Sequence, residues 1–194
     1  ARRAVDAGFD VVELHGAHGY LIHAFLSPLS NLRTDEYGGS LENRARYLLE
    51  IVSGVRAVIG DLPLFVRFSA TDWVEGGWTV EETAQVAAWA HERGADLFDI
   101  SSGGSSRAQN ITVGPGYQVG LASTVRRTAN VPVAAVGLIT DAEHADRIVR
   151  EGDADAVMAG REFMRDPHFA MRAARELGIQ IDYWPPQYER ARRA

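Results

Sequence analysis

Cysteine and lysine are both missing from this sequence of 194 residues, and all 20 basic residues are arginine. Without cysteine the chain has no disulfide and no thiolate nucleophile, as is common in cytoplasmic proteins. Without lysine it has no amine for Schiff-base chemistry. No run of 18 apolar residues and no signal peptide are visible. We therefore expect a cytoplasmic chain with no membrane partner.

The composition is that of a globular protein, with 46% hydrophobic and 24% charged residues. The formal net charge of -6 argues against nucleic acid as a partner. The opening residues, up to Gly8, have the pattern of the last turns of a helix before a strand, so we expect the sequence to begin in mid-domain. We expect residues 1–194 to form a single, partial domain.

Short apolar runs alternate with amphipathic segments along the chain. Five buried strands are expected, over residues 10–15, 64–68, 97–101, 131–136 and 154–159. Each is followed by a helix, and three helix starts are predicted from capping signals: Thr79 with Glu82, Thr140 with Glu143, and Asp166 with Pro167. This alternation predicts a parallel α/β sheet, either doubly wound or part of a (β/α)8 barrel. The lack of an early Gly-x-Gly-x-x-Gly turn disfavours a dinucleotide-binding sheet.

Two histidines and a tyrosine follow the first strand, in the stretch His15-Gly16-Ala17-His18-Gly19-Tyr20. Residues at the carboxyl ends of parallel strands are where such folds bind ligands. Two neutral imidazoles can each donate an N–H to one oxygen, and a phenol can protonate a carbanion. The stretch thus suits polarisation of an unsaturated carbonyl compound. Two other interpretations are that these are ordinary turn residues, or that His15, His18 and His23 bind a metal.

The last two strands end in glycine, at Gly137 and Gly160. Glycine lets a ligand approach the backbone, and Arg161 adds positive charge where a short helical turn begins. Paired glycines at the last two strands of a barrel are typical of a phosphate site. The alternative is that both are plain turn residues.

Arg67 lies on a strand that is otherwise apolar on both faces. A partly buried guanidinium needs an anionic or carbonyl partner. Glu13, on the neighbouring strand, is one candidate, and a heterocycle bearing a carbonyl is another.

Four motifs together resemble the Old Yellow Enzyme family, whose members are FMN-dependent ene-reductases on a (β/α)8 barrel. They are His15-Gly-Ala-His-Gly-Tyr-Leu, Phe25-Leu-Ser-Pro, Asn31-x-Arg33-x-Asp35-x-Tyr37-Gly-Gly-Ser40 and Asn43-Arg-x-Arg46. The resemblance runs over essentially the whole chain. It implies the C-terminal part of the barrel, about strands 4–8, with the first three strand–helix units missing.

The resemblance also implies roles for individual residues. His15 and His18, with Gly16 and Ala17 between them, would bind the substrate's activating oxygen, and Tyr20 would protonate the α-carbon. The flavin would contact Arg67 at its pyrimidine edge, and its phosphate would be held by Gly137, Leu138, Gly160 and Arg161. In the bacterial subgroup that the tail Gln187-Tyr-Glu-Arg190 resembles, an arginine reaches into a neighbour's active site. Arg190 takes that place here, unless it is a solvated terminal charge.

The expected function is therefore an FMN-dependent oxidoreductase that uses NADPH or NADH to reduce the C=C bond of α,β-unsaturated carbonyl compounds. Its partners would be a small-molecule substrate and other copies of itself, as a dimer or tetramer in the full-length form. The alternative is a non-catalytic, truncated half-barrel that needs the missing part or a partner chain. A phosphate-binding isomerase or aldolase is a third possibility, against which the absence of lysine counts.

Overall fold

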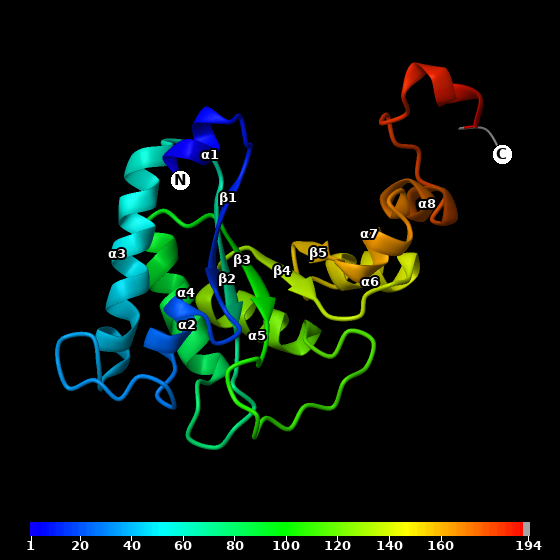
Figure 1. The fold of residues 1–194 in the computed structure, drawn as a ribbon. Helices are drawn as coiled ribbons and strands as arrows, with labels where there is room; N and C mark the ends of the chain where they lie inside the picture. The colour runs from blue at the N-terminus through cyan, green and yellow to red at the C-terminus, as the bar shows by residue number, and fades with distance from the viewer. Residues whose placement is uncertain (192–194) are drawn as a thin grey trace.

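The computed structural model describes residues 1–191, in which five strands form one parallel sheet (Figure 1). The strands are β1 (Val12–Gly16), β2 (Leu64–Ser69), β3 (Leu97–Ser101), β4 (Val133–Val136) and β5 (Ala156–Met158). Their order in the sheet is their order in the sequence. A doubly wound sheet reverses its strand order at a switch point, whereas a barrel adds each strand beside the previous one. The sheet is thus a parallel α/β sheet consistent with part of a (β/α)8 barrel.

Helices follow the strands as the sequence predicts. They are α1 (Arg2–Asp6), α2 (Leu21–Leu26), α3 (Leu41–Ile59), α4 (Val80–Glu92), α5 (Val119–Ala129), α6 (Ala142–Arg150), α7 (Arg161–Arg165) and α8 (Phe169–Glu176), with a 3-10 turn at Pro186–Ala191. The capping box of Thr79 and Glu82 at the start of α4 is confirmed, with both of its hydrogen bonds present.

Two predicted helix starts are wrong, one by one residue and the other by two. At α6 the cap is Asp141 and not Thr140, because the Asp141 carboxylate accepts from the backbone N–H of His144. At the last helix, Asp166 instead closes a turn by accepting from the N–H of His168, and α8 begins only at Phe169. At α6 the neighbouring short polar residue, Asp141, competed with Thr140 for the same backbone donors. At α8 no side chain caps the helix, whose N-cap residue is His168.

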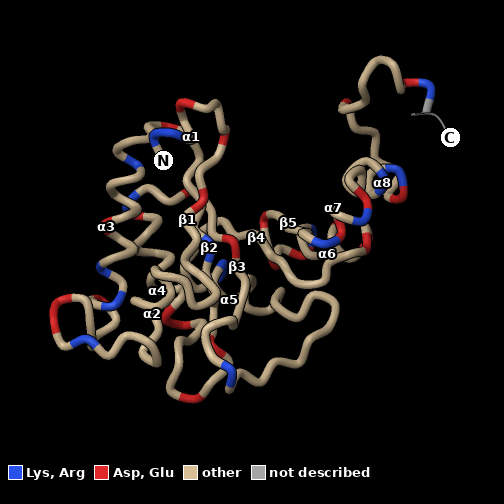
Figure 2. The backbone as a smooth tube through the Cα atoms, in the orientation of Figure 1, with Lys and Arg blue, Asp and Glu red and all other residues tan. Residues whose placement is uncertain are grey.

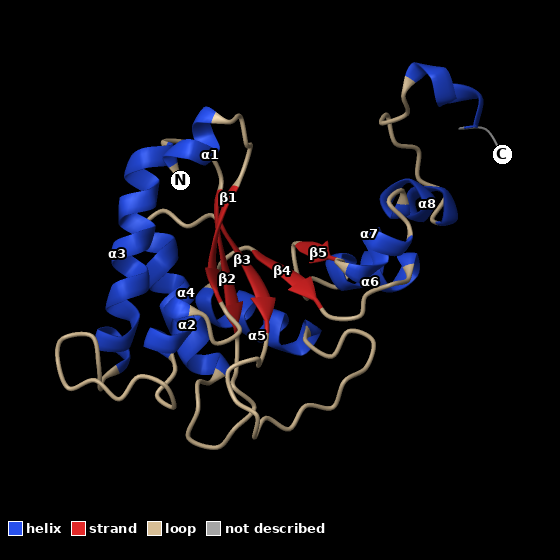
Figure 3. Cartoon of the chain, viewed as in Figure 1, coloured by secondary structure: helices blue, strands red, loops and turns tan. Residues whose placement is uncertain are grey.

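The core lies between the sheet and the helices α3, α4 and α5 (Figure 3). Side chains alternate along β2: Leu64, Val66 and Phe68 are fully buried on the helix side, and Phe65 and Arg67 are half-buried on the other face. This second face, called the inner face below, carries the polar strand residues. The burial of apolar side chains against the helices therefore fixes which residues point toward the site.

Helix α2, which follows the site loop, is tied to its neighbours by Arg44 on α3. The Arg44 side chain is 7% exposed and pairs with Glu82 on α4 at 2.5 Å. It also donates to the backbone oxygen of Leu26 at the end of α2. The long loop between α2 and α3 packs on itself, because the Asn31 amide donates to the carbonyls of Phe25 and Tyr37. This loop is thus a packed support for α2.

Candidate active site

The loop from β1 to α2 brings the predicted imidazoles and phenol together. The ring centroids of His15 and His18 are 5.2 Å apart, and those of His15 and Tyr20 are 5.3 Å apart. Gly16 and Ala17, between the histidines, are buried. A Cβ on Gly16 would lie 2.9 Å from the carbonyl oxygen of Arg67, so only glycine lets β1 pass this close to β2. The three rings therefore form one constellation at the end of a strand.

His18 is held by two serines from the neighbouring strands. Its backbone N–H donates to Oγ of Ser69 at 2.9 Å, and its Nε2 lies 2.7 Å from Oγ of Ser101. These serines lie opposite each other on β2 and β3. Sequence reasoning did not single them out, although both are polar residues at the end of an apolar strand.

Both histidines are neutral at pH 7. Burial, Arg67 and the other imidazoles lower the pKa of His18 to about 4. The pKa of His15 is lowered by burial, Arg67 and His23. A neutral imidazole keeps one N–H donor and one acceptor nitrogen. No cluster of three metal-ligating side chains occurs within residues 1–191. Nδ1 of His23 accepts a backbone hydrogen bond, and its Nε2 lies 3.1 Å from the Asp72 carboxylate without hydrogen-bond geometry.

Arg67 lies between His15 and Asp99 in the sheet register. Its Nε is 3.0 Å from Oδ2 of Asp99, and the two side chains are 25% and 0% exposed. Burial raises the pKa of Asp99 to about 7, against the opposing effect of Arg67. Glu13, the partner suggested from the sequence, pairs with Phe65 in the register, one row away. The protein partner of Arg67 is thus Asp99, a buried acid in mid-strand that the sequence analysis missed.

The side chain of Arg67 is 25% exposed, so a ligand can reach part of it. Its Nε donates no geometrically sound hydrogen bond to any residue in the described part of the chain, and the same holds for Asp99 as an acceptor. One cation, one buried acid and two neutral imidazoles therefore meet on the inner face.

The two strand-end glycines lie at neighbouring strands, since Val136 on β4 is the register partner of Met158 on β5. Gly137 and Leu138 both adopt positive φ, at 131° and 52°. Gly160 immediately precedes α7, which begins at the exposed Arg161. The four residues predicted to hold a phosphate thus lie at the ends of two adjacent strands.

A buried glutamine that sequence reasoning missed supports this end of the sheet. Gln118, 2% exposed, accepts from the Ser102 hydroxyl at 2.6 Å and donates to the Val136 carbonyl at 2.9 Å. It bridges the ends of β3 and β4, so the backbone leading into Gly137 is fixed.

Arg190 is not part of the constellation within this chain. It lies exposed in the C-terminal 3-10 turn, which stands well apart from the end of β1 (Figure 1). Figure 2 shows acidic and basic residues interspersed along the chain. Among them, Arg172 forms ion pairs with Asp166 and Glu176.

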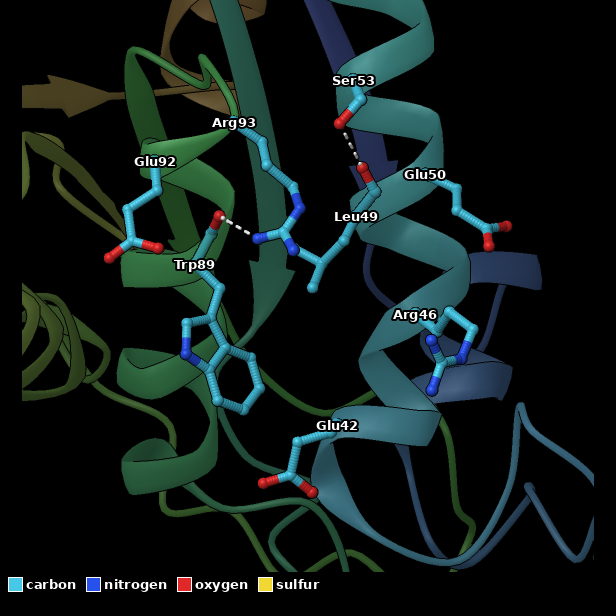
Figure 4. A pocket seen from close by; sticks show the side chains of 8 residues that line it. All are labelled: Glu42, Arg46, Leu49, Glu50, Ser53, Trp89, Glu92 and Arg93. Atoms are coloured by element: carbon cyan, nitrogen blue, oxygen red, sulfur yellow. Dashed lines mark hydrogen bonds between the residues drawn. The ribbon is translucent and has the colours of Figure 1, made fainter.

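The surface pockets lie away from these residues. One of about 640 Å³, between α3 and α4, is lined by Glu42, Arg46, Leu49, Glu50, Ser53, Trp89, Glu92 and Arg93 (Figure 4). Another, of about 1150 Å³, lies between α7, α8 and the tail. Neither contains a histidine of the constellation, so we locate the candidate site by its chemistry and not by cavity volume.

Known proteins are similar to this chain in sequence and in fold. The family model described as "NADH:flavin oxidoreductase / NADH oxidase family" matches residues 1–180. An NADPH dehydrogenase of Bacillus subtilis (strain 168) is 53% identical over 190 residues, which cover 98% of this chain and 55% of that protein.

Two solved structures are similar to this chain in fold. Morphinone reductase superposes with a TM-score of 0.72 at 31% identity, over 96% of this chain and 48% of that one. The old yellow enzyme homologue from Zymomonas mobilis gives a TM-score of 0.74 at 27% identity, over 96% and 54%.

The chain belongs to the NADH:flavin oxidoreductase / NADH oxidase family, and the Old Yellow Enzyme resemblance predicted from its motifs is confirmed. The family's cofactors are FMN and NAD(P)H. The chain spans about half the length of the curated relatives it matches. Within the described residues, no helix is both long and apolar enough to cross a membrane.

Proposed function

We propose that the protein is an FMN-dependent NAD(P)H ene-reductase that reduces the C=C bond of α,β-unsaturated carbonyl compounds. The observation that carries the proposal is the constellation of His15, His18 and Tyr20 beside Arg67. The family membership supplies the flavin and the nicotinamide. Morphinone reductase, a relative by fold, is by its name a reductase.

His15 and His18 would hold the carbonyl oxygen of the substrate, with the backbone of Gly16 and Ala17 lining the same loop. When hydride adds to the β-carbon, negative charge develops on that oxygen. Because both imidazoles have lowered pKa values, they are neutral N–H donors that need not be desolvated as cations. Fixed donors aimed at a developing oxyanion are each worth about 2.7–4 kcal/mol in comparable sites.

Tyr20 would donate the proton to the α-carbon. Its ring is in edge contact with that of His15 and is 65% exposed, so a substrate held by the histidines has access to the phenol. A phenol can act as a general acid toward a carbanion when it is in hydrogen-bond reach.

The residues present fit FMN at two points. Arg67, whose side chain is 25% exposed, offers a cation on the inner face to a carbonyl-bearing ring. Gly137, Leu138, Gly160 and Arg161 offer backbone and one cation to a phosphate at the adjacent strand ends. Of these, Gly160 and Arg161 are exposed, Leu138 is half-buried and Gly137 is buried. When bound, FMN supplies the two-electron chemistry that links NAD(P)H to the alkene. Arg67 would favour negative charge on the ring edge that it contacts.

Three further expectations belong to this proposal. The five strands would be strands 4–8 of the barrel, within a single partial domain of residues 1–194. Arg190 would complete the substrate site of a second copy in a dimer or tetramer, since its own chain keeps it apart from the histidines. The protein would act in the cytoplasm.

A second candidate applies to the 194-residue chain by itself: a half-barrel that does not retain flavin. The chain covers 55% of its curated relative, and β1 and β5 have only one neighbour each within the described sheet. The inner face is then open along two edges.

Flavin retention and turnover test both candidates. We expect the protein expressed from its complete coding sequence to be yellow and to oxidise NAD(P)H only slowly until 2-cyclohexenone is added. A colourless protein that does not bind added FMN would contradict the ene-reductase. If the 194-residue chain alone retains FMN after gel filtration, the half-barrel candidate is wrong.

A further inference from the structure

A chain of buried polar groups lies beneath the loop that carries His18 and Tyr20. His23 on α2, together with Ser27 and Asp72, is 0% exposed. The backbone N–H of Gly19 donates to Nδ1 of His23 at 2.9 Å. The other ring nitrogen, Nε2, lies 3.1 Å from Oδ1 of Asp72. None of these three side chains takes part in the proposed chemistry.

Asp72 is the anchor of this chain. Its Oδ2 accepts from the Ser27 hydroxyl at 2.6 Å and from the backbone N–H of Trp78 at 2.9 Å. Burial opposes ionisation, but the His23 ring, the Ser27 hydroxyl and the Trp78 N–H that face the carboxyl hold its pKa below the usual value. A buried carboxylate with these donors is an acceptor at fixed position.

The hydrogen bond from Gly19 defines the tautomer of His23. Because Gly19 donates to Nδ1, that nitrogen carries no proton, and the ring proton lies on Nε2, which faces Asp72. The order of groups is therefore Gly19 N–H, imidazole, carboxylate. Asp72 orients the ring, and the ring presents a lone pair to the loop.

The lone pair on Nδ1 of His23 fixes the backbone N–H of Gly19. This glycine separates His18 from Tyr20, and His18 and Gly19 both adopt positive φ, at 58° and 76°. Such a conformation at a histidine is sparsely populated and persists only where the surroundings enforce it. The loop has a fixed acceptor for each of these two backbone N–H groups: Ser69 for His18 and His23 for Gly19.

We propose that His23 is a positioning residue for the reaction, which sets the directions of His18 and Tyr20 by accepting the Gly19 N–H, with Asp72 holding its ring in place. This inference rests on the proposed ene-reductase function. His23 reaches the substrate only through the two side chains that flank Gly19. A displacement of about 1 Å at such a site is enough to cost roughly a hundredfold in rate.

Two substitutions separate this role from a merely structural one. In His23→Asn the side-chain oxygen takes the place of Nδ1, so an acceptor for Gly19 remains and the donor to Asp72 is lost. In His23→Gln the side-chain nitrogen takes the place of Nε2, so the donor to Asp72 remains and the acceptor for Gly19 is lost. If His23 served only to satisfy the buried Asp72, Gln would be the better replacement.

We expect the opposite order, measured in the flavin-loaded protein from the complete coding sequence. His23→Gln should lower kcat for enone reduction about 100-fold. His23→Asn should lower kcat by less than about 10-fold. Hydrogen exchange of the Gly19 amide should be faster in the Gln variant than in the Asn variant. Reduction of the flavin by NAD(P)H, which needs no proton from Tyr20, should proceed alike in both.

Ser27→Ala is the matched control, because it removes one bond to Asp72 and leaves the Gly19 contact in place. It should lower the unfolding temperature without the change in Gly19 exchange. Equal enone rates in the two His23 variants, or a faster Gln variant, would overturn the inference. If the parent protein reduces no enone, the proposed function fails first and the inference falls with it.

A measurement on the unsubstituted protein covers the case in which neither variant folds. The ¹⁵N chemical shift of His23 at pH 7 should show an unprotonated Nδ1 and a protonated Nε2. A proton on Nδ1 would exclude the Gly19 bond and with it the positioning role.

Discussion

Loss of the ion pair between Arg67 and Asp99 should have two effects that can be measured separately, one on the free energy of unfolding and one on the flavin potential. Replacement of Arg67 by Met leaves the fully buried Asp99 without its cation. Loss of one partner of a buried pair costs about 3–5 kcal/mol when the remaining group stays ionised. Asp99, however, can take up a proton, because burial has already raised its pKa to about 7 and the opposing effect of Arg67 is removed.

The size of the penalty therefore depends on pH. A carboxyl whose pKa is raised on folding binds its proton more tightly when folded, so its contribution to stability is lost as the pH rises toward the folded pKa. Near pH 6 Asp99 is mostly protonated with or without Arg67, and we expect a penalty below about 1 kcal/mol. Above pH 7 the penalty should grow by at most about 1.4 kcal/mol per pH unit, reaching about 3 kcal/mol near pH 9.

Urea unfolding of the FMN-free protein at pH 6 and pH 9 measures this difference. The double variant with Asp99→Asn is the control, since it has no carboxyl and should show the same free energy of unfolding relative to its own reference at both pH values. Glu13, whose pKa burial raises and Arg67 lowers, responds to the loss of Arg67 with or without Asp99, so its effect is removed when the two penalties are compared. A penalty of equal size at both pH values would refute the reasoning.

The flavin potential should behave differently. Arg67→Met should lower the midpoint potential of bound FMN, because a cation near the pyrimidine edge favours the anionic ring, and Asp99→Asn should not restore it. An unchanged midpoint potential in the Met variant, measured by spectroelectrochemistry, would exclude the flavin role of Arg67.

Other consequences concern the substrate constellation. His15→Ala and His18→Ala should each cost about 2.7–4 kcal/mol of transition-state stabilisation, that is, about a hundredfold or more in kcat/KM for an enone; parent-like rates in both would exclude their role. Tyr20→Phe should slow the reaction of the enone and leave reduction of the flavin by NAD(P)H nearly unchanged, and stopped-flow traces with equal losses in both half-reactions would contradict this. In an NMR titration the His18 ring should protonate with a pKa of about 4; a midpoint near the ordinary histidine value would show that its burial and the field of Arg67 are misjudged.

Much of this fold was predictable because the strands are short, buried and separated by clear capping signals. The sequence showed Arg67 on a strand apolar on both faces, and the structure shows that the helices cover the face of Leu64, Val66 and Phe68, which leaves Arg67 on the other face. Strand order, in contrast, depends on which neighbours pair, and the choice between a doubly wound sheet and a barrel needed the structure.

The site was predictable where chemistry and sequence neighbourhood coincide, as for His15, His18 and Tyr20 in one loop. It was not predictable where partners come from distant strands. Asp99 faces Arg67 only through the register of β2 and β3, and Asp72 meets His23 across 49 positions of sequence. Local pattern carries no information on such pairs, although an acid inside an apolar strand, as at Asp99, is a signal that a partner is required.

The most direct test of the ene-reductase is the position of isotope in its product. The protein from the complete coding sequence is incubated with NAD(P)H and 2-cyclohexenone in D₂O, and the product is analysed by NMR and mass spectrometry. We expect saturated ketone with solvent deuterium at the α-carbon, delivered through Tyr20, and hydrogen from the nicotinamide at the β-carbon. Recovery of unchanged enone from a protein that holds FMN and oxidises NAD(P)H, or of an allylic alcohol with its C=C bond intact, would contradict the assignment of this site.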